Sequence, residues 1–375
     1  MTPSKIPEIY SVFFKLGITA FGGPAAHIAL MQNEIVEKRR WLSDQEFLDL
    51  LGATQLIPGP NSTEMAMHCG YKRGGFWGLI AAGVAFILPA FCLTLALAWG
   101  YVQFAAIPVL DPFLFGIKPA MIAVIFFALL KLSKKACKTG STVLIGLLVG
   151  VAILLGVSEI LALFMGGLIG GFYVAFKRSR TSILSVSISA LPVLWDQLIS
   201  SKLGRLFFEC LKIGSVLYGS GYVLIAYVET TFVHQLGWLT PEALLDAVAI
   251  GQLTPGPVLT TATVIGYFLL GYKGAVLATI GIFLPSFFFV LALNPLIAKL
   301  RGVPVLSGFL DGVNASAVAL MAVVTLKLSV TVLTQWESMV ILAFACLFMG
   351  IRIVNANVLL LIGLSSVLGY VLLIL

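Results

Sequence analysis

Charged residues are scarce in this chain, and that scarcity decides its class. Asp, Glu, Lys and Arg make up 10% of the 375 residues, 60% are hydrophobic, and the mean hydropathy is +1.07. A water-soluble domain of this size needs far more polar surface. The composition therefore excludes a soluble globular protein and predicts an all-α polytopic membrane protein in contact with the lipid bilayer. The net charge of +7 does not indicate nucleic-acid binding, because the positive residues cluster in short loops.

Cysteine and histidine are rarer still, with five and three copies. The cysteines show no CxxC spacing, so we expect no disulfide framework, no metal centre and no cofactor. We interpret them as small apolar packing residues. The N-terminus lacks a short apolar stretch followed by a small-residue cleavage site, so no cleaved signal peptide is expected.

One short stretch occurs twice, at residues 55–60 (Gln-Leu-Ile-Pro-Gly-Pro) and at residues 252–257 (Gln-Leu-Thr-Pro-Gly-Pro). A Pro-Gly-Pro stretch cannot continue a helix, and proline suits the first turn of a new one, so each stretch ends one helix and opens another. We expect the new helices at 60–71 and 257–268. The N–H groups at such a start have no intrahelical partner, and the helix dipole there is positive. Inside a membrane protein these properties predict an anion site.

The two stretches belong to a long internal repeat. A spacing of 197 residues aligns Trp41 with Trp238 and Asp49 with Asp246, as well as the two Pro-Gly-Pro stretches. After a one-residue deletion, a spacing of 196 aligns further pairs: Gly70 with Gly266, Pro89 with Pro285, and Gly116 with Gly312. So many matches in one register indicate a duplication. We expect a first transporter repeat at 1–180, a linker at 181–204 and a second repeat at 205–375.

The positive charges predict the orientation of the repeats. Lys- and Arg-rich loops occur at 38–40, 72–73, 131–138 and 177–180, and we expect all of them in the cytoplasm. One crossing before residue 38, a re-entrant hairpin up to residue 73 and four crossings after it make an odd number. The second repeat is then inverted, and both termini lie outside.

The predicted protein has about ten transmembrane helices together with broken or re-entrant half-helices, and we expect it in the cytoplasmic (inner) membrane. The four crossings after residue 73 are expected at 75–101, 112–131, 141–157 and 159–176. An inverted-topology repeat is typical of secondary transporters, which bind substrate at the repeat interface near the midplane.

A few polar residues interrupt the apolar runs. Lys118, followed by Pro119, lies deep in such a run, where a cation is costly unless it faces a wet cavity or an anion. Its aligned partner is Asn314. Lys15 and Lys212 each precede a glycine-rich break by seven residues. They are candidates for coupling or gating, and the alternative is that they snorkel to a membrane interface.

The helix expected after Pro60 carries a second polar group. Residues 61–63 (Asn-Ser-Thr) occupy its first turn, and Glu64 and His68 share one face because they are four residues apart. The alternative is ordinary capping by Ser62 and Thr63, with Glu64 complementing the helix dipole. We favour a functional role, because polar residues inside a membrane usually mark a pathway.

The candidate substrate-binding residues are Gly22, Gly23, Pro24, His27, Gln55, Pro58, Gly59, Pro60, Asn61, Ser62, Thr63, Glu64, Lys118, Gly219, Ser220, Gly221, Gln252, Pro255, Gly256, Pro257 and Asn314. The candidate coupling or gating residues are Lys15, His68, Lys212 and Asp311. We expect the first, polar copy of the Pro-Gly-Pro site to dominate substrate binding and the second, apolar copy to shape the cavity.

Several motifs in both halves resemble the chromate ion transporter family in its long, two-domain form. In the first half they are Phe21-Gly22-Gly23-Pro24 with His27, Arg40-Trp41-Leu42-Ser43, residues 47–54 (Phe-Leu-Asp-Leu-Leu-Gly-Ala-Thr) and residues 58–64 (Pro-Gly-Pro-Asn-Ser-Thr-Glu). In the second half they are Gly219-Ser220-Gly221-Tyr222, Gly237-Trp238-Leu239-Thr240, residues 254–257 (Thr-Pro-Gly-Pro) and residues 281–287 (Gly-Ile-Phe-Leu-Pro-Ser-Phe). The resemblance covers nearly the whole chain. It implies a secondary active transporter that exports chromate and confers chromate resistance.

Other readings stay open at this point. Sulfate or another oxyanion is an alternative substrate, by transport or exchange, and a homodimer is an expected assembly. An anion channel could use the same helix starts but has no need for the acidic and imidazole groups. An intramembrane enzyme with His27, His68 and Glu64 as acid–base groups lacks a nucleophile beside a base, so we expect no enzymatic activity.

Overall fold

The computed structural model describes residues 5–19, 24–104, 111–178, 201–218, 221–294, 304–351 and 358–374. Within these ranges the chain is helical and has no strand, which confirms the predicted all-α fold. Five helices are long and apolar enough to cross a membrane: Asn61–Phe104, Asp111–Ala136, Glu159–Phe176, Val258–Leu293 and Pro304–Val332. Three shorter apolar helices accompany them: Gly140–Leu154, Trp336–Gly350 and Leu360–Ile374.

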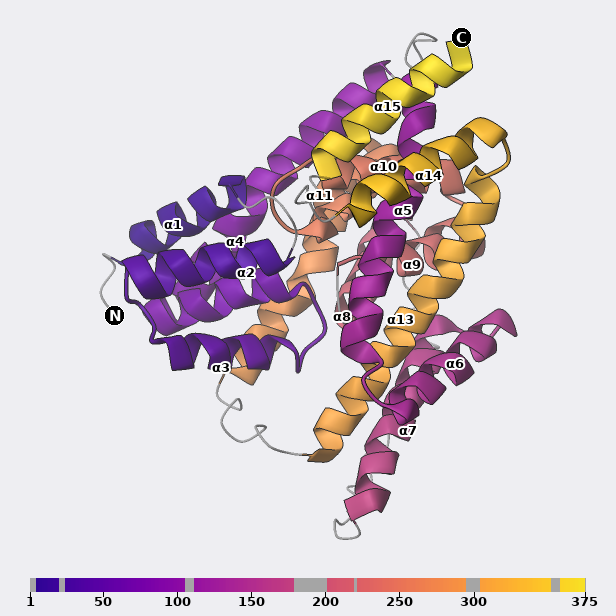
Figure 1. Cartoon of the computed structure of the whole chain (residues 1–375). Helices are drawn as coiled ribbons and strands as arrows, with labels where there is room; N and C mark the ends of the chain where they lie inside the picture. The colour runs from indigo at the N-terminus through magenta and orange to yellow at the C-terminus, as the bar shows by residue number, and fades with distance from the viewer. Residues whose placement is uncertain are drawn as a thin grey trace.

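The helices occur in the same order in both halves (Figure 1). The first half contains α1 (Ile6–Thr19), α2 (Pro24–Gln32), the π-helix η2 (Asn33–Lys38), α3 (Asp44–Thr54), α4 (Asn61–Phe104), α5 (Asp111–Ala136), α6 (Gly140–Leu154) and α7 (Glu159–Arg178). The second contains α8 (Lys202–Val216), α9 (Val223–Val228), the π-helix η4 (Glu229–Gln235), α10 (Pro241–Gln252), the 3₁₀-helix η5 (Val258–Thr260), α11 (Thr261–Leu293), α13 (Pro304–Val332), α14 (Trp336–Gly350) and α15 (Val358–Ile374).

The start of the first half differs from the single crossing expected before residue 38. The structure divides that segment into α1, of 14 residues, and α2, of 9 residues, which runs on into η2. Neither α1 nor α2 reaches the roughly 20 residues that a spanning helix needs. Residues 20–23, where the sequence has two glycines before Pro24, lie outside the described residues. Most of the expected linker, residues 181–200, also lies outside them.

The long helices α4 and α11 each consist of two arms. Gly75 in α4 and Gly271 in α11 have positive φ angles of 63° and 60°, which interrupt the helix. The short arm then packs on the long arm so closely that a Cβ at Gly70 or at Gly266 would overlap a carbonyl oxygen of the facing glycine. The separate helices predicted at 60–71 and 75–101 correspond to the two arms of α4.

Each half completes its core with helices from the other half. Helix α13 packs most extensively on α7 and also on α6, while α5 packs on α15 and α14. Gly116 and Gly312, which are aligned in the sequence, make this possible, since a Cβ at either would overlap the backbone of the facing helix. In Figure 1, α5 runs downward to the α6 turn, whereas its counterpart α13 runs upward from the lower edge.

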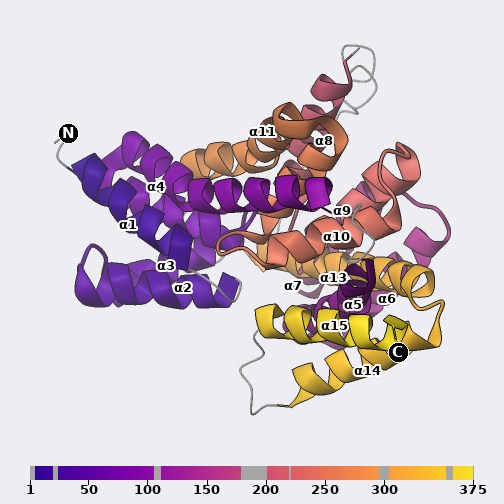
Figure 2. The same cartoon turned by 90° about the horizontal axis from the view of Figure 1, so that it is seen from above.

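The two halves are not packed symmetrically. Helices α9 and α10 are inserted among the long helices, where α9 packs on α13 and α10 packs on α5. Their counterparts α2 and α3 instead pack mainly on η2 and on α4. Figures 1 and 2 both show α1, α2 and α3 gathered with part of α4 at one side of the molecule.

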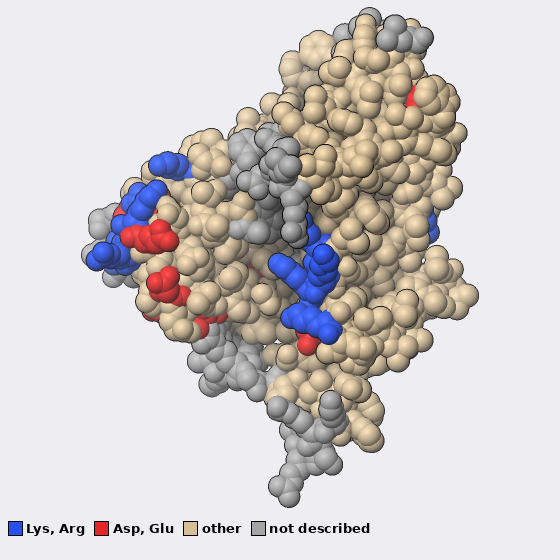
Figure 3. Space-filling model, in the orientation of Figure 1, with Lys and Arg blue, Asp and Glu red and all other residues tan. Residues whose placement is uncertain are grey.

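Most charged residues on the face shown in Figure 3 gather in two regions: the edge formed by α1–α3, and the lower end of α5. The residues at the end of α5 and in the following turn are the exposed lysines Lys131, Lys134, Lys135 and Lys138. Large apolar side chains are exposed elsewhere, among them Leu147, Phe172 and Val330, at 64%, 64% and 78%. Such a surface fits contact with lipid acyl chains.

Helix α3 begins with the predicted capping box. Ser43 Oγ accepts a hydrogen bond from the backbone N–H of Glu46, and Glu46 Oε2 accepts one from the backbone N–H of Ser43 at 2.9 Å. This second bond lowers the pKa of the Glu46 carboxyl. The contribution of Glu46 to stability is therefore present above its unfolded pKa and is lost as the pH falls through the lowered value.

We expect Ser43→Ala to destabilise α3 by about 1 kcal/mol, because the cap is lost. Thermal unfolding of the purified protein in detergent at neutral pH would show this as a lower transition temperature. Ser11→Ala, at an exposed position within α1, is the matched control and should leave the transition unchanged. An equal transition for both variants would contradict the assigned cap.

Candidate functional site

The first Pro-Gly-Pro is buried and packs against the second half of the chain. Gly59 has a φ angle of 139°, which side chains other than hydrogen rarely allow. Its backbone N–H donates to the carbonyl oxygen of Leu217 at 2.7 Å, just after α8. A Cβ on Gly59 would overlap Ser286 Oγ of α11 and the Glu64 carboxyl of its own helix. The break is therefore held by both α8 and α11.

The second Pro-Gly-Pro likewise packs against the opposite half, which in this case is the first half of the chain. Gly256 has a φ angle of 98°, and a Cβ there would lie 2.7 Å from the Cβ of Ala90 in α4. Ala90 and Ser286 are aligned in the repeat, and each directly follows the proline within its long helix. Thr94 Oγ1, one turn further along α4, donates to Thr254 Oγ1 at 3.3 Å. Each break thus packs on the long helix of the other half.

The two helix starts differ in polarity. Helix α4 begins at Asn61, so the N–H groups of its first turn point beyond the helix toward the break. The corresponding start in the second half is apolar at Val258 and Leu259. The two threonines that follow are satisfied locally, because Thr260 Oγ1 donates to Pro257 O at 2.8 Å and Thr261 Oγ1 to Val258 O at 2.9 Å. Of the two described helix starts, only the first therefore offers polar side chains to a ligand in addition to backbone N–H groups.

Helix α4 carries three fully buried side chains whose polar groups are incompletely satisfied. Glu64 Oε1 accepts a hydrogen bond from Ser286 Oγ at 3.3 Å, and His68 Nδ1 lies 3.2 Å from Asn294 Oδ1. Three other atoms, Thr63 Oγ1, Glu64 Oε2 and His68 Nε2, have no partner among the described residues. Thr63, Glu64 and His68 are each 0% exposed. Such atoms are costly to bury alone, so they indicate a place for water, a proton or a ligand.

Lys118 lies in a different cluster from the one expected. Its Nζ is 3.7 Å from Asp246 Oδ2, and Tyr101 Oη donates to the same carboxylate oxygen at 2.7 Å. Asp246 is 7% exposed and belongs to α10, whereas Lys118 and Tyr101 belong to α5 and α4. The pair therefore links the two halves.

Asp246 aligns with Asp49 in the repeat but is not among the site residues predicted from the sequence. A signal was present, because Asp246 is an acidic residue within the apolar run Ala-Leu-Leu-Asp-Ala-Val-Ala-Ile. Its aligned counterpart Asp49 lies on α3 and accepts a hydrogen bond from Gln45 at 2.8 Å. The two aligned aspartates thus have different surroundings.

The remaining candidates are dispersed. His27 is buried and meets the Phe86 ring edge-on, with ring centroids 5.7 Å apart. Gln252 is half-buried, and its Oε1 accepts from Tyr222 Oη at 3.4 Å. Asn314 is half-buried on α13. Exposed candidates are Gln55, Lys15, Asp311 and Lys212, of which Lys212 pairs with Glu209.

The glycine-rich breaks are described only in part. Gly22, Gly23, Gly219 and Ser220 lie outside the described residues. Pro24 is the first residue of α2. Gly221 is buried, and a Cβ there would lie 2.9 Å from the Cβ of Val258, next to the second Pro-Gly-Pro. In the part of the chain that the structure describes, no three His, Cys, Asp or Glu side chains converge to hold a metal ion.

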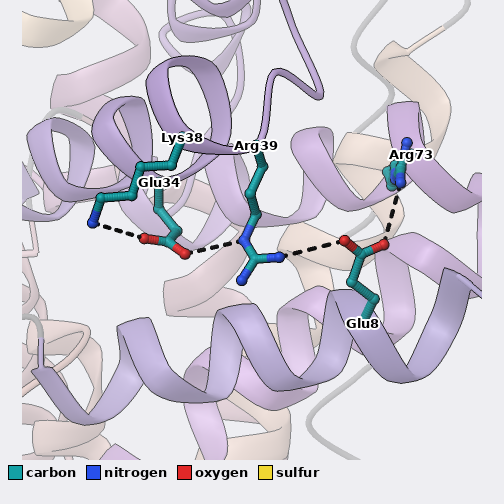
Figure 4. A network of polar contacts seen from close by, with 5 residues as sticks. All are labelled: Glu8, Glu34, Lys38, Arg39 and Arg73. Atoms are coloured by element: carbon teal, nitrogen blue, oxygen red, sulfur yellow. Dashed lines mark hydrogen bonds and ion pairs between the residues drawn. The ribbon is translucent and has the colours of Figure 1, made fainter.

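A chain of ion pairs fixes the charged end of the first half (Figure 4). Glu34 pairs with Lys38 at 3.3 Å and with Arg39 at 3.0 Å, and Arg39 reaches Glu8 of α1 at 3.4 Å. Glu8 also pairs with Arg73, at the end of the short arm of α4, at 3.2 Å. The network ties η2, α1 and α4 together where the sequence predicts cytoplasmic loops.

The family profile described as "Chromate transporter" matches this chain twice, over residues 7–171 and 204–370. The chain belongs to the chromate transporter family. The profile thus matches once in each half of the chain, and the family agrees with the resemblance found in the motifs.

Curated relatives of this chromate transporter family chain cover most of its length. It is 31% identical to the chromate transport protein of Cupriavidus metallidurans, over 83% of this chain and 79% of the relative. It is 31% identical to the chromate transport protein of Pseudomonas aeruginosa, over 87% and 82% of the two chains. It is 30% identical to the probable chromate transport protein of Synechococcus elongatus, over 85% and 83%. No solved structure matches the fold.

Proposed function

We propose that this protein is a secondary active transporter that exports chromate from the cytoplasm, and that the oxyanion binds at the first Pro-Gly-Pro break. The observation that carries this proposal is the group of buried, incompletely satisfied polar atoms at the polar start of α4. Chromate is a tetrahedral dianion and needs several converging N–H and hydroxyl donors. The first turn of α4 supplies both kinds of donor, and the relatives named for chromate transport point to the same substrate.

The membrane potential favours the proposed direction. An inside-negative potential assists the exit of an anion by about 2.3 kcal/mol per charge per 100 mV. Sulfate has the same shape and charge as chromate, so we include it as a competing substrate. In this proposal the second break shapes the cavity from the other half, through Gly256 and Ala90.

Transport assays with matched variants test the site. We expect Asn61→Ala to lower the uptake of labelled chromate into proteoliposomes containing purified protein, because one donor at the start of α4 is lost. Val258→Ala changes the aligned position in the second half and should retain most of the uptake. Excess unlabelled sulfate should lower the uptake of labelled chromate if the site recognises only the shape and charge of the anion. Equal losses in the two variants, at matched reconstitution, would refute the division of roles between the two starts.

We further propose that the two repeats are inverted in the membrane, with loop 38–40 in the cytoplasm and both termini outside. The positive loops and the opposite directions of α5 and α13 support this arrangement. Loop 38–40 and the aligned loop at 235–237 should then lie on opposite sides.

Site-directed labelling tests the topology. Arg40→Cys and Gln235→Cys should react with a membrane-impermeant maleimide from opposite sides of sealed vesicles. The background would lack Cys92, Cys137 and Cys346 but keep Cys69 and Cys210, which are 1% and 2% exposed. Reaction of both positions from the same side would rule out the inverted arrangement.

A further inference from the structure

We propose that Glu64 is the proton-carrying residue of this transporter, and that its carboxyl must be protonated when an oxyanion occupies the start of α4. The proposal rests on the oxyanion site proposed above. It changes the role of Glu64 from a ligand of the anion to the group that couples a proton to the movement of the anion.

The Glu64 carboxyl lies beside the proposed anion site. The Glu64 carboxyl lies against the backbone of Gly59, so closely that a Cβ there would overlap Oε1. The acid therefore occupies the space beside the helix start, where an anion would bind the free N–H groups. An ionised carboxylate and a dianion repel strongly in a medium of low dielectric constant. The two negative charges exclude one another unless the carboxyl takes up a proton or moves away.

Among the described residues, no cation pairs with the Glu64 carboxyl. The groups facing Glu64 are Ser286 of α11, Tyr218 just after α8, and His68 one turn along α4. None of them is a permanent cation. Lys72 lies a further turn along α4, where its charge acts on His68. Burial without a paired cation favours the neutral, protonated carboxyl.

Glu64 and His68 together form a route by which a proton can leave the site. Glu64 Oε2 and His68 Nε2 both lack partners among the described residues, and the two side chains share one face of the short arm of α4. His68 Nδ1 is held by Asn294 from α11, which fixes the ring. The short arm ends at Lys72 and Arg73, in a loop expected to face the cytoplasm. A proton leaving Glu64 Oε2 can therefore pass through an intervening water to His68 Nε2, toward that loop.

The second half lacks this route. At the repeat spacing of 196, the positions of Glu64 and His68 correspond to Thr260 and Val264, and that of Ser286 corresponds to Ala90. None of these side chains titrates in the physiological range. The proton site therefore belongs to one half only, which fits the polar difference between the two helix starts.

The test uses full-length protein in liposomes that contain a pH-sensitive dye. The variants are Glu64→Gln, which keeps the shape of a protonated carboxyl, and Glu37→Gln, the same change at an exposed position on η2. Two processes are measured, namely net chromate flux with its proton movement, and exchange of labelled for unlabelled chromate. Exchange moves no net charge or proton, so it reports binding and translocation alone.

Wild type and Glu37→Gln should move protons together with chromate, and their rates should depend on pH. Glu64→Gln should still exchange chromate, but its chromate flux should be uncoupled from protons and independent of pH. Proton movement that persists in Glu64→Gln would overturn the proposal, and so would loss of both exchange and chromate binding in that variant. Wild-type chromate flux without protons would overturn the proposal but leave the proposed function standing. Absence of any wild-type chromate flux would overturn the proposed function itself.

Discussion

Lys118→Met is expected to abolish chromate transport. The substitution removes the cation that lies 3.7 Å from Asp246 and leaves a 7% exposed carboxylate with only the Tyr101 hydroxyl as a partner. Removing one member of a buried charge pair typically costs about 3–5 kcal/mol. The pair also joins α5 of the first half to α10 of the second, so its loss should disturb the packing between halves as well as the local charge.

Two further variants separate a role in folding from a role in binding. Asp246→Asn removes the partner charge, and the double variant Lys118→Met/Asp246→Asn removes both charges together. The double variant should recover the thermal stability that the single variants lose, since no unpaired charge stays buried. We expect it still to fail in transport, because the sequence-based prediction assigns Lys118 to the anion.

Measurements of chromate uptake and of thermal unfolding on the same preparations would decide between these roles. Lys131→Met, at an exposed position near the end of α5, is the control and should transport normally. Full transport by the double variant would show that Lys118 serves only to neutralise Asp246. Normal transport by Lys118→Met alone would remove Lys118 from the mechanism.

Gly59→Ala is expected to eliminate transport almost completely. The φ angle of 139° at Gly59 disfavours any side chain, and the new methyl group would overlap both Ser286 Oγ and the Glu64 carboxyl. These are the two groups that face each other across the first break. To make room, the start of α4 must move away from α11, which opens the proposed anion site.

The control for this variant is Gly237→Ala. Gly237 also has a positive φ angle, of 60°, but a Cβ there would meet nothing within 4 Å. Gly237→Ala carries a backbone penalty of about 1–2 kcal/mol for a left-handed residue, whereas Gly59→Ala carries the strain of a φ angle almost restricted to glycine and adds the overlap. Chromate uptake at matched expression should therefore separate them. Similar uptake by both variants would show that the first break is not close to the site.

The local features of this chain could be predicted from its sequence. The Pro-Gly-Pro at residues 58–60 ends one helix and begins the next, because two prolines and a glycine fall within three residues. Ser43 and Glu46 form the predicted capping box because both partners lie within one turn. Composition alone predicted the helical membrane fold, since backbone hydrogen bonds must be satisfied within each segment when lipid is the solvent. The internal repeat was visible because identical residues recur at a constant spacing.

The tertiary structure decided which polar groups meet. Ser286 faces Glu64, and Asp246 faces Lys118, although each pair comes from different halves of the chain. Helical periodicity shows which residues share a face of one helix, but not which distant helix covers that face. Here α5 packs on α15 and α13 packs on α7, across the two halves, whereas α8 packs on α11 and α1 packs on α4 within one half. The sequence could therefore predict two helix breaks and a few buried polar residues, whereas their division into two separate clusters follows only from how the two halves pack together.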